Sequence, residues 1–230
     1  MKTIGIIGGM SWESTVPYYR DVNELVKQRL GGLHSAKVIV YSVDFHEVAL
    51  LQNTGAWAEA GTLMARAATS LVAAGAEIIL LATNTMHEVA PAIEAAIDVP
   101  FIHIADPTAA AIKAADLVRV GLLGTRFTME REFYTGRLSE VHGIDVVIPE
   151  EDDRAEVHRV IYEELARGVI SETSRDGFRD IIGRLASAGA QGVILGCTEI
   201  GLLVGPGDSP VPLFDTGALH VRAAVDLALR

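Results

Sequence analysis

An internal repeat constrains the fold of this 230-residue chain more than any other feature of its sequence. The segment 74–85, AGAEIILLATNT, aligns without a gap on the segment 188–199, AGAQGVILGCTE, at an offset of 114 residues (Gly75 to Gly189). Two shorter pairs follow in the same order: IGIIG at 4–8 with VGLLG at 120–124, and VPF at 99–101 with VPL at 211–213. Because the offset stays nearly constant, the chain is predicted to consist of two similar halves.

Short apolar runs that end at turn residues predict the strands of a parallel sheet. They are almost continuously apolar, and stretches with helical spacing of apolar residues follow them, which is typical of a sheet covered by helices on both faces. The expected strands are 3–7, 37–42, 77–81, 100–104, 119–123, 144–148, 192–195 and 211–214. Apolar helix faces are expected over 60–72 and 178–185. The predicted fold class is α/β, with two pseudo-symmetric, doubly wound parallel-sheet domains related by the repeat.

The repeat also sets the expected domain limits. The first domain is expected over 1–98 plus 209–230, where a C-terminal helix returns to cover it, and the second over 99–208. Ligands of open parallel sheets bind outside the carboxyl ends of the strands. If the halves face each other about a pseudo-twofold axis, their strand-end loops would hold a small ligand in the cleft between them.

Composition excludes several classes of protein. A single cysteine cannot form an intrachain disulfide, which argues against a disulfide-stapled secreted scaffold and favours a reducing, cytoplasmic location. No apolar stretch reaches the ~18 residues of a membrane span, and no signal-peptide pattern is present. With a net charge of −11 and no basic patch, the chain is not expected to bind nucleic acid.

Cys197 is the first candidate for chemistry. It follows an apolar strand and precedes a stretch that could begin a helix at Thr198. A helix N-terminus would lower the pKa of the thiol and favour the reactive thiolate. The alternative is a buried, inert cysteine, since free cysteine is among the most buried residue types. The repeat favours the catalytic interpretation, because it places another polar side chain, Thr83, at the equivalent strand end.

Other motifs give weaker indications. Glu199 could orient or deprotonate a neighbour, or lie exposed in a first helical turn. His87 could be a general base, or a surface residue of a helix beginning near Thr85. The other histidines lack zinc-binding spacing, so no metal site is expected. The segment 5–11, GIIGGMS, matches neither nucleotide-binding pattern, which favours a tight turn with N–H groups for a small anion and no nucleotide cofactor.

Four segments together carry a resemblance to a known family. They are GGMS at 8–11, TNTMH at 83–87, LGTRFTM at 123–129 and GCTEI at 196–200. The chain resembles the aspartate/glutamate racemase family over nearly its whole length. The resemblance implies two pseudo-symmetric α/β domains, a homodimer, and cofactor-independent racemisation of an amino-acid substrate by two cysteines on opposite faces of the α-carbon.

The chain departs from the family pattern at Thr83, where the family usually has the first of its two cysteines. Racemisation needs a base on one face of the α-carbon and an acid on the other. A hydroxyl can donate a proton but is a poor base, whereas a thiol can be tuned toward neutral pH. Unequal rates are therefore expected for the two enantiomers, with the direction that uses Cys197 as base favoured.

The remaining candidate residues bind substrate. The side chains of Asn84, Thr85 and Thr198, with backbone N–H groups of their loops, are expected to hold the α-carboxylate. The resemblance adds Met10 through its backbone, Gln52 and Thr125 as pocket residues. Specificity stays open among aspartate, glutamate and uncharged amino acids such as homoserine, because 44–47 (DFHE) contains no arginine and 164–167 (ELAR) only Arg167.

Two other functions remain as alternatives. Single-cysteine relatives of the superfamily decarboxylate substituted malonates, with one thiol protonating an enolate on one face only. They resemble the chain through its second-half cysteine but not through the Met10 loop or the Asn84–Thr85 pair. An amino-acid-binding protein that has lost catalysis is the third possibility, and it predicts binding without exchange of the α-proton.

Overall fold

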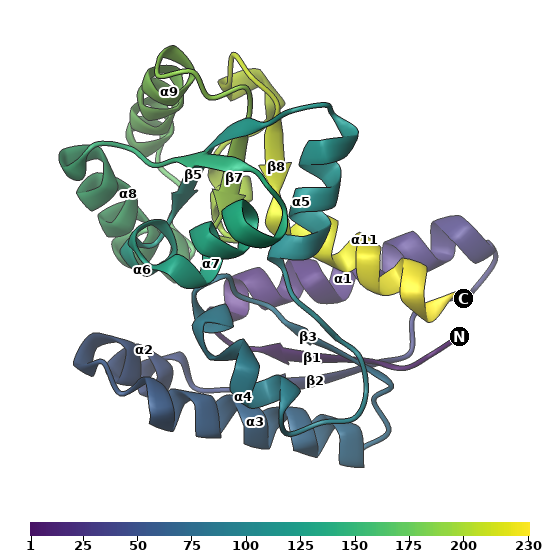
Figure 1. Ribbon diagram of the computed structural model, residues 1–230. Helices are drawn as coiled ribbons and strands as arrows, with labels where there is room; N and C mark the ends of the chain where they lie inside the picture. Colours follow the sequence, from purple (N-terminus) through teal and green to yellow (C-terminus); the bar gives the residue numbers. More distant parts are fainter. The chain divides into compact units, whose positions relative to one another are not determined.

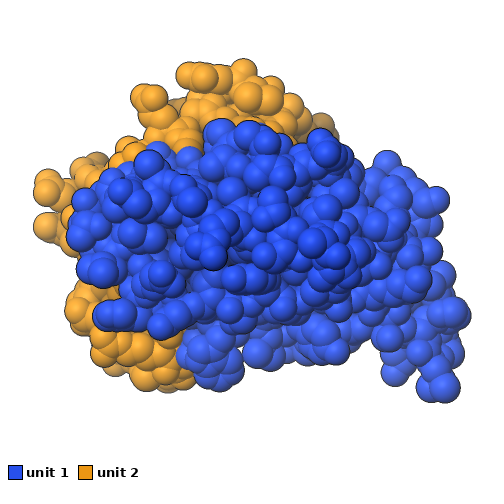
Figure 2. All heavy atoms as spheres, turned by 90° about the horizontal axis from the view of Figure 1, so that it is seen from below, with its two compact units in different colours: residues 1–103, 220–230 blue, residues 104–219 orange.

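The computed structural model describes residues 1–230, which divide into two compact units. Figure 2 distinguishes them: the first unit is Met1–His103 with His220–Arg230, and the second is Ile104–Leu219. Each unit contains its own four-stranded parallel sheet. None of the helices combines the length and the apolar character that crossing a membrane requires.

The first unit is built on a sheet with the strand order β2-β1-β3-β4 (Figure 1). Its strands are β1 (Ile4–Gly8), β2 (Val38–Ser42), β3 (Ile78–Leu81) and β4 (Phe101–Ile102). Its helices are α1 (Trp12–Leu30), α2 (Phe45–Thr54), α3 (Trp57–Ala73), the 3-10 helix η1 (Thr85–Val89) and α4 (Ala90–Glu94). Most of α11 (Thr216–Ala228) also belongs to this unit.

Side chains alternate across this first sheet, so each face buries its own apolar layer. Ile4 and Ile6 of β1 pack with residues of α1 and α11, whereas Ile7 packs with residues of α2 and α3. The buried face of α3 includes Met64 and lies within the helical pattern expected over 60–72. Helices therefore cover both faces of the sheet, as continuous apolar strands require.

The second unit repeats this arrangement with the strand order β6-β5-β7-β8. Its strands are β5 (Arg119–Gly124), β6 (Asp145–Val147), β7 (Val193–Gly196) and β8 (Leu213–Asp215). The longer helices are α5 (Ala105–Ala114), α8 (Glu151–Glu163) and α9 (Glu172–Ser187). The short ones are α6 (Arg126–Glu130), α7 (Glu132–Gly136), η2 (Arg137–Val141), η3 (Leu165–Arg167), α10 (Ile200–Leu203) and η4 (Pro206–Asp208).

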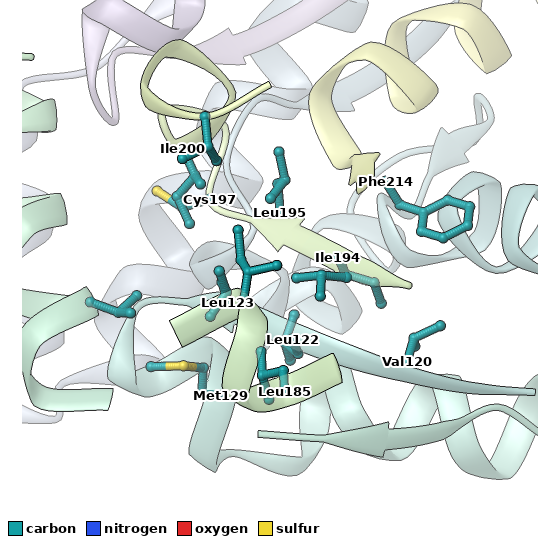
Figure 3. Close-up of a cluster of buried hydrophobic side chains, with 14 of the residues drawn as sticks. Val120, Leu122, Leu123, Met129, Leu185, Ile194, Leu195, Cys197, Ile200 and Phe214 are labelled. Carbon is teal, nitrogen blue, oxygen red and sulfur yellow. The ribbon is translucent and has the colours of Figure 1, made fainter. Parts of the chain in front are cut away.

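One large apolar cluster forms the core of the second unit. Leu122 of β5, Ile194 of β7 and Phe214 of β8 belong to it (Figure 3). Cys197 lies at the end of the cluster beside Ile200, so the thiol sits where the apolar core meets the loop after β7.

The predicted α/β fold with two parallel sheets is confirmed, and the repeat relates strands in equivalent positions of the two sheets. All eight expected strands are present, with small shifts at their ends. The strand expected over 100–104 is shorter and covers only Phe101–Ile102. Its last residue, Ile104, already has helical backbone angles because it precedes α5 directly.

Candidate active site

In the first unit, the candidate residues follow two neighbouring strands. Strand β1 pairs with β3 in the register Ile7 to Leu81, so the loop containing Met10 and the loop beginning at Thr83 leave the same edge of the sheet. Met10, Thr83, Asn84 and Thr85 are all buried. The fold therefore gathers these four predicted site residues at the carboxyl edge of one sheet, where ligands of such sheets bind.

The glycine-rich loop after β1 closes onto helix α1. Gly9 has a φ of 90°, which favours glycine, and its N–H donates to Thr15 Oγ1 at 2.8 Å. Thr15 Oγ1 in turn donates to the carbonyl of Ser11 at 2.9 Å. The N–H of Gly9 thus has a partner within the protein, and the threonine side chain holds the turn against helix α1.

Gln52 reaches the same neighbourhood from helix α2. Its side chain is buried, and its Nε2 lies 3.1 Å from Sδ of Met86, which follows Thr85 directly. The resemblance had suggested Gln52 as a pocket residue. The structure brings Gln52 next to the segment that carries Thr83, Asn84 and Thr85.

His87 is buried, with 1% of its surface exposed, so the interpretation of it as a surface residue is wrong. Its Nδ1 lies 2.8 Å from the carbonyl oxygen of Thr83. Since a carbonyl can only accept, Nδ1 carries the proton and donates it. The ring also packs edge-on against His103, with the ring centres 4.5 Å apart. His87 therefore anchors the backbone of the Thr83 loop through this hydrogen bond.

In the second unit, the candidate residues again follow neighbouring strands. Gly124 of β5 pairs with Gly196 of β7, and Thr125 and Cys197 are the next residues of the two strands. A Cβ on Gly196 would lie 2.8 Å from the backbone oxygen of Leu123, so glycine is needed for the two strand ends to approach. Thr125 caps helix α6 by accepting from the N–H of Thr128 at 3.2 Å.

Cys197 makes its closest polar contact with Glu199. The thiol donates to Oε2 of Glu199 at 3.0 Å, and the hydroxyl of Thr198 donates to the same oxygen at 2.9 Å. Glu199 is only 3% exposed, so the alternative interpretation of it as an exposed residue of a first helical turn is wrong. The structure thus joins Cys197, Thr198 and Glu199 into one hydrogen-bonded group.

The expected lowering of the Cys197 pKa is also wrong. Burial raises the pKa of the thiol well above its ordinary value, and the negative charge and hydrogen bond of Glu199 raise it further. The N–H of Glu199 opposes them only in part. Helix α10 begins at Ile200 and has four residues, so it starts too late and is too short to stabilise a thiolate at Cys197.

Tyr162 lies in the same neighbourhood, although no sequence motif indicates that it belongs to the site. It lies on helix α8, and its pKa is raised by burial and by the negative charges of Cys197 and Glu199. Its position follows from the packing of α8 beside the sheet, which local sequence patterns do not encode. No group of three or more His, Cys, Asp or Glu side chains is arranged to hold a metal ion.

Comparisons with known proteins point to one family. A family model described as Asp/Glu/Hydantoin racemase matches residues 7–224. The solved structure of a candidate Asp/Glu racemase from Yersinia pestis is 59% identical, with a TM-score of 0.92 and 100% of both chains covered. An aspartate racemase homologue from Pyrococcus horikoshii is 37% identical, with a TM-score of 0.86 and 100% of both chains covered.

A curated relative gives a more distant match. The glutamate racemase of Exiguobacterium sibiricum is 28% identical over 165 residues, which are 68% of this chain and 59% of that protein. The resemblance first seen in the four sequence segments is thereby confirmed across the chain. With the family model covering nearly every residue, this chain belongs to the Asp/Glu/Hydantoin racemase family.

Proposed function

We propose that this chain is a cofactor-independent amino-acid racemase of the aspartate/glutamate type. One observation carries the proposal: the two sheets have the same strand order, so Thr83 after β3 and Cys197 after β7 occupy equivalent strand ends. Membership of the racemase family supports the same reaction class. The two loops would bind one amino acid between them, with Cys197 on one face of the α-carbon and Thr83 on the other.

Cys197 is proposed as the base on its face. The thiolate takes the α-proton, the C–H bond breaks, and its electron pair passes into the carboxylate to give an enediolate. Glu199 supports this step because its carboxylate already accepts the thiol proton at 3.0 Å and can hold it while the thiolate acts. The ammonium group of a bound amino acid would further favour the thiolate, since an opposite charge nearby stabilises the charged form.

Thr83 is proposed as the proton donor on the opposite face. Because a hydroxyl gives up a proton to a carbanion more readily than it removes one, the two directions differ. The equilibrium constant of a racemisation is one, so kcat/KM must be equal in both directions. The asymmetry therefore belongs to kcat and KM taken separately, and to the exchange of the α-proton with solvent.

The remaining candidates would bind the substrate. Asn84, Thr85 and Thr198, with N–H groups of their loops, would hold the α-carboxylate and the charge that develops on it. Met10, Gln52 and Thr125 would line the pocket. Gln52 and Met10 are supported by their burial beside the Thr83 loop, and Thr125 by its position next to Cys197 at the sheet edge.

Proton NMR in D2O, combined with chiral chromatography, tests the proposal with L- and D-aspartate, L- and D-glutamate and several neutral amino acids. The enantiomer whose α-proton faces Cys197 should exchange that proton for deuterium faster than it inverts, because Cys197 can return a deuteron to the face it deprotonated. The other enantiomer should show no exchange ahead of inversion. Cys197→Ala should lower both exchange and inversion by about 100- to 10,000-fold.

Thr83→Cys provides the matched test of the opposite face. A thiol at this position should bring the kcat values of the two directions closer together and let both enantiomers exchange. If the ratio of the two kcat values stays the same, Thr83 is not the opposite-face group. Full activity in Cys197→Ala would exclude the proposed mechanism. Absence of exchange with every amino acid, together with loss of carbon dioxide from substituted malonates, would identify a decarboxylase instead.

The resemblance also leads us to propose a homodimer. Multi-angle light scattering after size exclusion gives the mass directly, and a dimer would have twice the 24.5 kDa of the chain. A mass of one chain across the concentrations used for activity would exclude this part of the proposal.

A further inference from the structure

Arg126 is a cation beside the Cys197 loop that the proposed reaction has not used. It follows Thr125 directly after strand β5, whose neighbour β7 ends one residue before Cys197. Its side chain is exposed, and the guanidinium carbon lies 5.5 Å from the centre of the Phe127 ring. A cation at this distance is attracted by the ring, which favours a defined position near the sheet edge.

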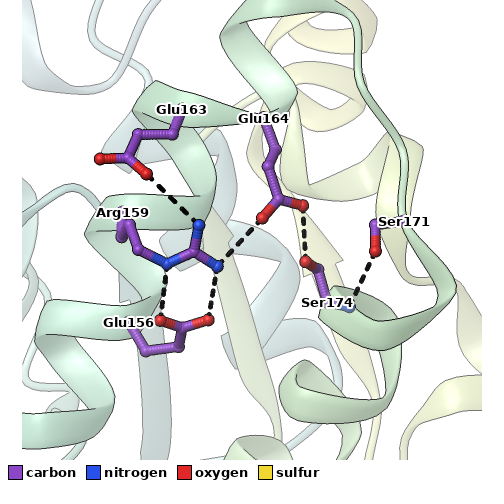
Figure 4. Close-up of polar contacts among 6 residues, drawn as sticks. All are labelled: Glu156, Arg159, Glu163, Glu164, Ser171 and Ser174. Atoms are coloured by element: carbon purple, nitrogen blue, oxygen red, sulfur yellow. Dashed lines mark hydrogen bonds and ion pairs between the residues drawn. The ribbon is translucent and has the colours of Figure 1, made fainter.

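Most arginines of the chain are already engaged by carboxylates, but Arg126 forms no ion pair. Arg159 is the opposite extreme, since Glu156, Glu163 and Glu164 surround its guanidinium (Figure 4). The other arginines with carboxylate partners include Arg20, Arg29, Arg119, Arg137, Arg154, Arg175, Arg179 and Arg184. In a chain with a net charge of −11, an exposed arginine without such a partner retains its full capacity to bind an anion.

Helix α8 links Arg126 to Cys197. The backbone N–H of Arg126 donates to Nδ1 of His158 at 3.2 Å, and the His158 and Tyr162 rings lie with centres 4.7 Å apart. The Tyr162 hydroxyl is close enough to Arg126, Cys197 and Glu199 that all three influence its pKa. Burial and the Arg126 charge lower the pKa of His158, so the ring accepts from Arg126 as a neutral imidazole.

An acidic amino acid has a second carboxylate, which needs a positive charge away from the carboxylate of Glu199. Glu199 places a carboxylate beside Cys197, where the α-carbon would react, and its negative charge would repel a second carboxylate. Arg126 offers a guanidinium at the same sheet edge, and its planar fork can bind a carboxylate with two parallel hydrogen bonds.

We propose that Arg126 binds the side-chain carboxylate of the substrate and so determines selectivity for acidic over neutral amino acids. This inference rests on the proposed racemase function, whose pocket it completes on the second unit. Arg167, the one arginine of the segment 164–167 from which the sequence left specificity open, lies exposed at the end of η3 and follows no strand.

Steady-state racemisation of glutamate and of its neutral isostere glutamine tests the inference in wild type, Arg126→Gln, Arg126→Lys and Arg167→Gln. Arg126→Gln should raise the KM for glutamate at least about tenfold, as expected for the loss of one charge-assisted contact. Its kcat for glutamate should change much less, and the preference for glutamate over glutamine should fall by the same factor. Arg126→Lys should recover part of the loss, and Arg167→Gln should match wild type.

Calorimetric titration with glutarate separates the two possible failures, because glutarate has two carboxylates but no α-amino group to react. Weakened glutarate binding in Arg126→Gln supports the inference even if no amino acid is racemised, in which case the proposed function alone has failed. An unchanged KM, an equal loss for glutamate and glutamine, or unchanged or absent glutarate binding overturns it. Equal melting temperatures of the variants exclude unfolding as the cause.

Discussion

At the scale of single residues, the Cys197 thiol is held in its protonated form in the absence of substrate. Burial and Glu199 both disfavour the thiolate. Since Cys197 is the only cysteine, its reaction with iodoacetamide reports its ionisation directly. We predict that the alkylation rate rises with pH to a midpoint above the ordinary pKa of about 8.5 for a thiol. Glu199→Gln should lower this midpoint, because it removes the negative charge that repels the thiolate. Mass spectrometry of the single adduct gives both curves.

Glu172→Gln is the control for the Cys197 titration. Glu172 is an exposed carboxylate of the same unit, and its partner is Arg175 on helix α9. Its substitution should leave the alkylation midpoint unchanged. The account of Cys197 would be wrong if wild type and Glu199→Gln had the same midpoint, or if the wild-type midpoint lay near neutral pH.

His87 acts on the site through the backbone of Thr83. We predict that His87→Leu lowers the free energy of unfolding by about 1–3 kcal/mol, because it leaves the buried Thr83 carbonyl without its donor. It should also lower kcat, since the loop that positions the Thr83 hydroxyl loses its anchor. His87→Asn places an amide N–H near the position of Nδ1 and should recover part of both losses. Urea unfolding and steady-state kinetics measure the two effects. Equal kcat values in His87→Leu and wild type would refute the positioning role.

At the scale of secondary-structure elements, the ends of β5 and β7 depend on two facing glycines. A Cβ on Gly196 would lie 2.8 Å from the Leu123 carbonyl and 2.7 Å from the Leu122 side chain. Backbone cannot rotate away from this contact, so we predict that Gly196→Ala costs about 1–3 kcal/mol of stability. It should also reduce turnover, because Cys197 is the next residue. Urea unfolding monitored by far-UV circular dichroism measures the stability change.

Gly183→Ala is the matched control for this prediction. Gly183 lies inside helix α9, and a Cβ there would meet no atom within 4 Å. Alanine should therefore stabilise the helix by up to about 1 kcal/mol, since glycine is the weaker helix former. If both alanine variants were stabilised, the close approach at Gly196 would not restrict the strand ends.

The elements themselves were largely predictable because they follow local patterns. Continuous apolar runs predicted every strand, and the repeat predicted that the two halves have equivalent sheets. Errors occurred where the end of one element depends on the start of the next, as at Ile104, which caps the N-terminus of helix α5 instead of extending β4. The length of α10 is a similar case, because nothing in Thr198–Glu199 predicts that the helix starts only at Ile200.

The sequence predicted the candidate site only at positions that the repeat aligns between the two halves. Alignment of the two halves selected Cys197 and Thr83, since both follow equivalent strands. Tyr162 was missed because its place near Cys197 results from the packing of α8 beside the sheet. Arg126 was missed because β5 and β7 become neighbours only in the folded sheet. The direction of the Cys197 pKa shift was missed for a related reason: burial and the side-chain direction of Glu199 outweigh a helix dipole and are not local sequence properties.

At the scale of the whole molecule, a buried thiol and a buried phenol link the stability of the second unit to pH. Burial raises the pKa of Tyr134 well above its ordinary range, and that of Cys197 is raised as well. Above pH ~8.5 for the thiol and ~10 for the phenol, the unfolded chain loses protons that the folded chain retains. Stability conferred by these groups is therefore complete at neutral pH and falls as pH rises. The expected slope is about 1.4 kcal/mol per pH unit for each group.

Trp12 and Trp57 are the two tryptophans of the chain, and both belong to the first unit. Their fluorescence therefore shows which unit loses stability as the pH rises. In urea at pH 10.5, we predict that far-UV circular dichroism reports an earlier transition than tryptophan fluorescence, because the second unit unfolds first. Cys197→Ala should reduce the pH dependence from pH ~8.5 upward, and Tyr134→Phe above pH ~10. Tyr19→Phe, at a side chain that is 55% exposed on α1, is the control. Coincident transitions at every pH would mean that the two units unfold together. The chain passes from one unit to the other at 103–104 and again at 219–220, so such coupling is possible.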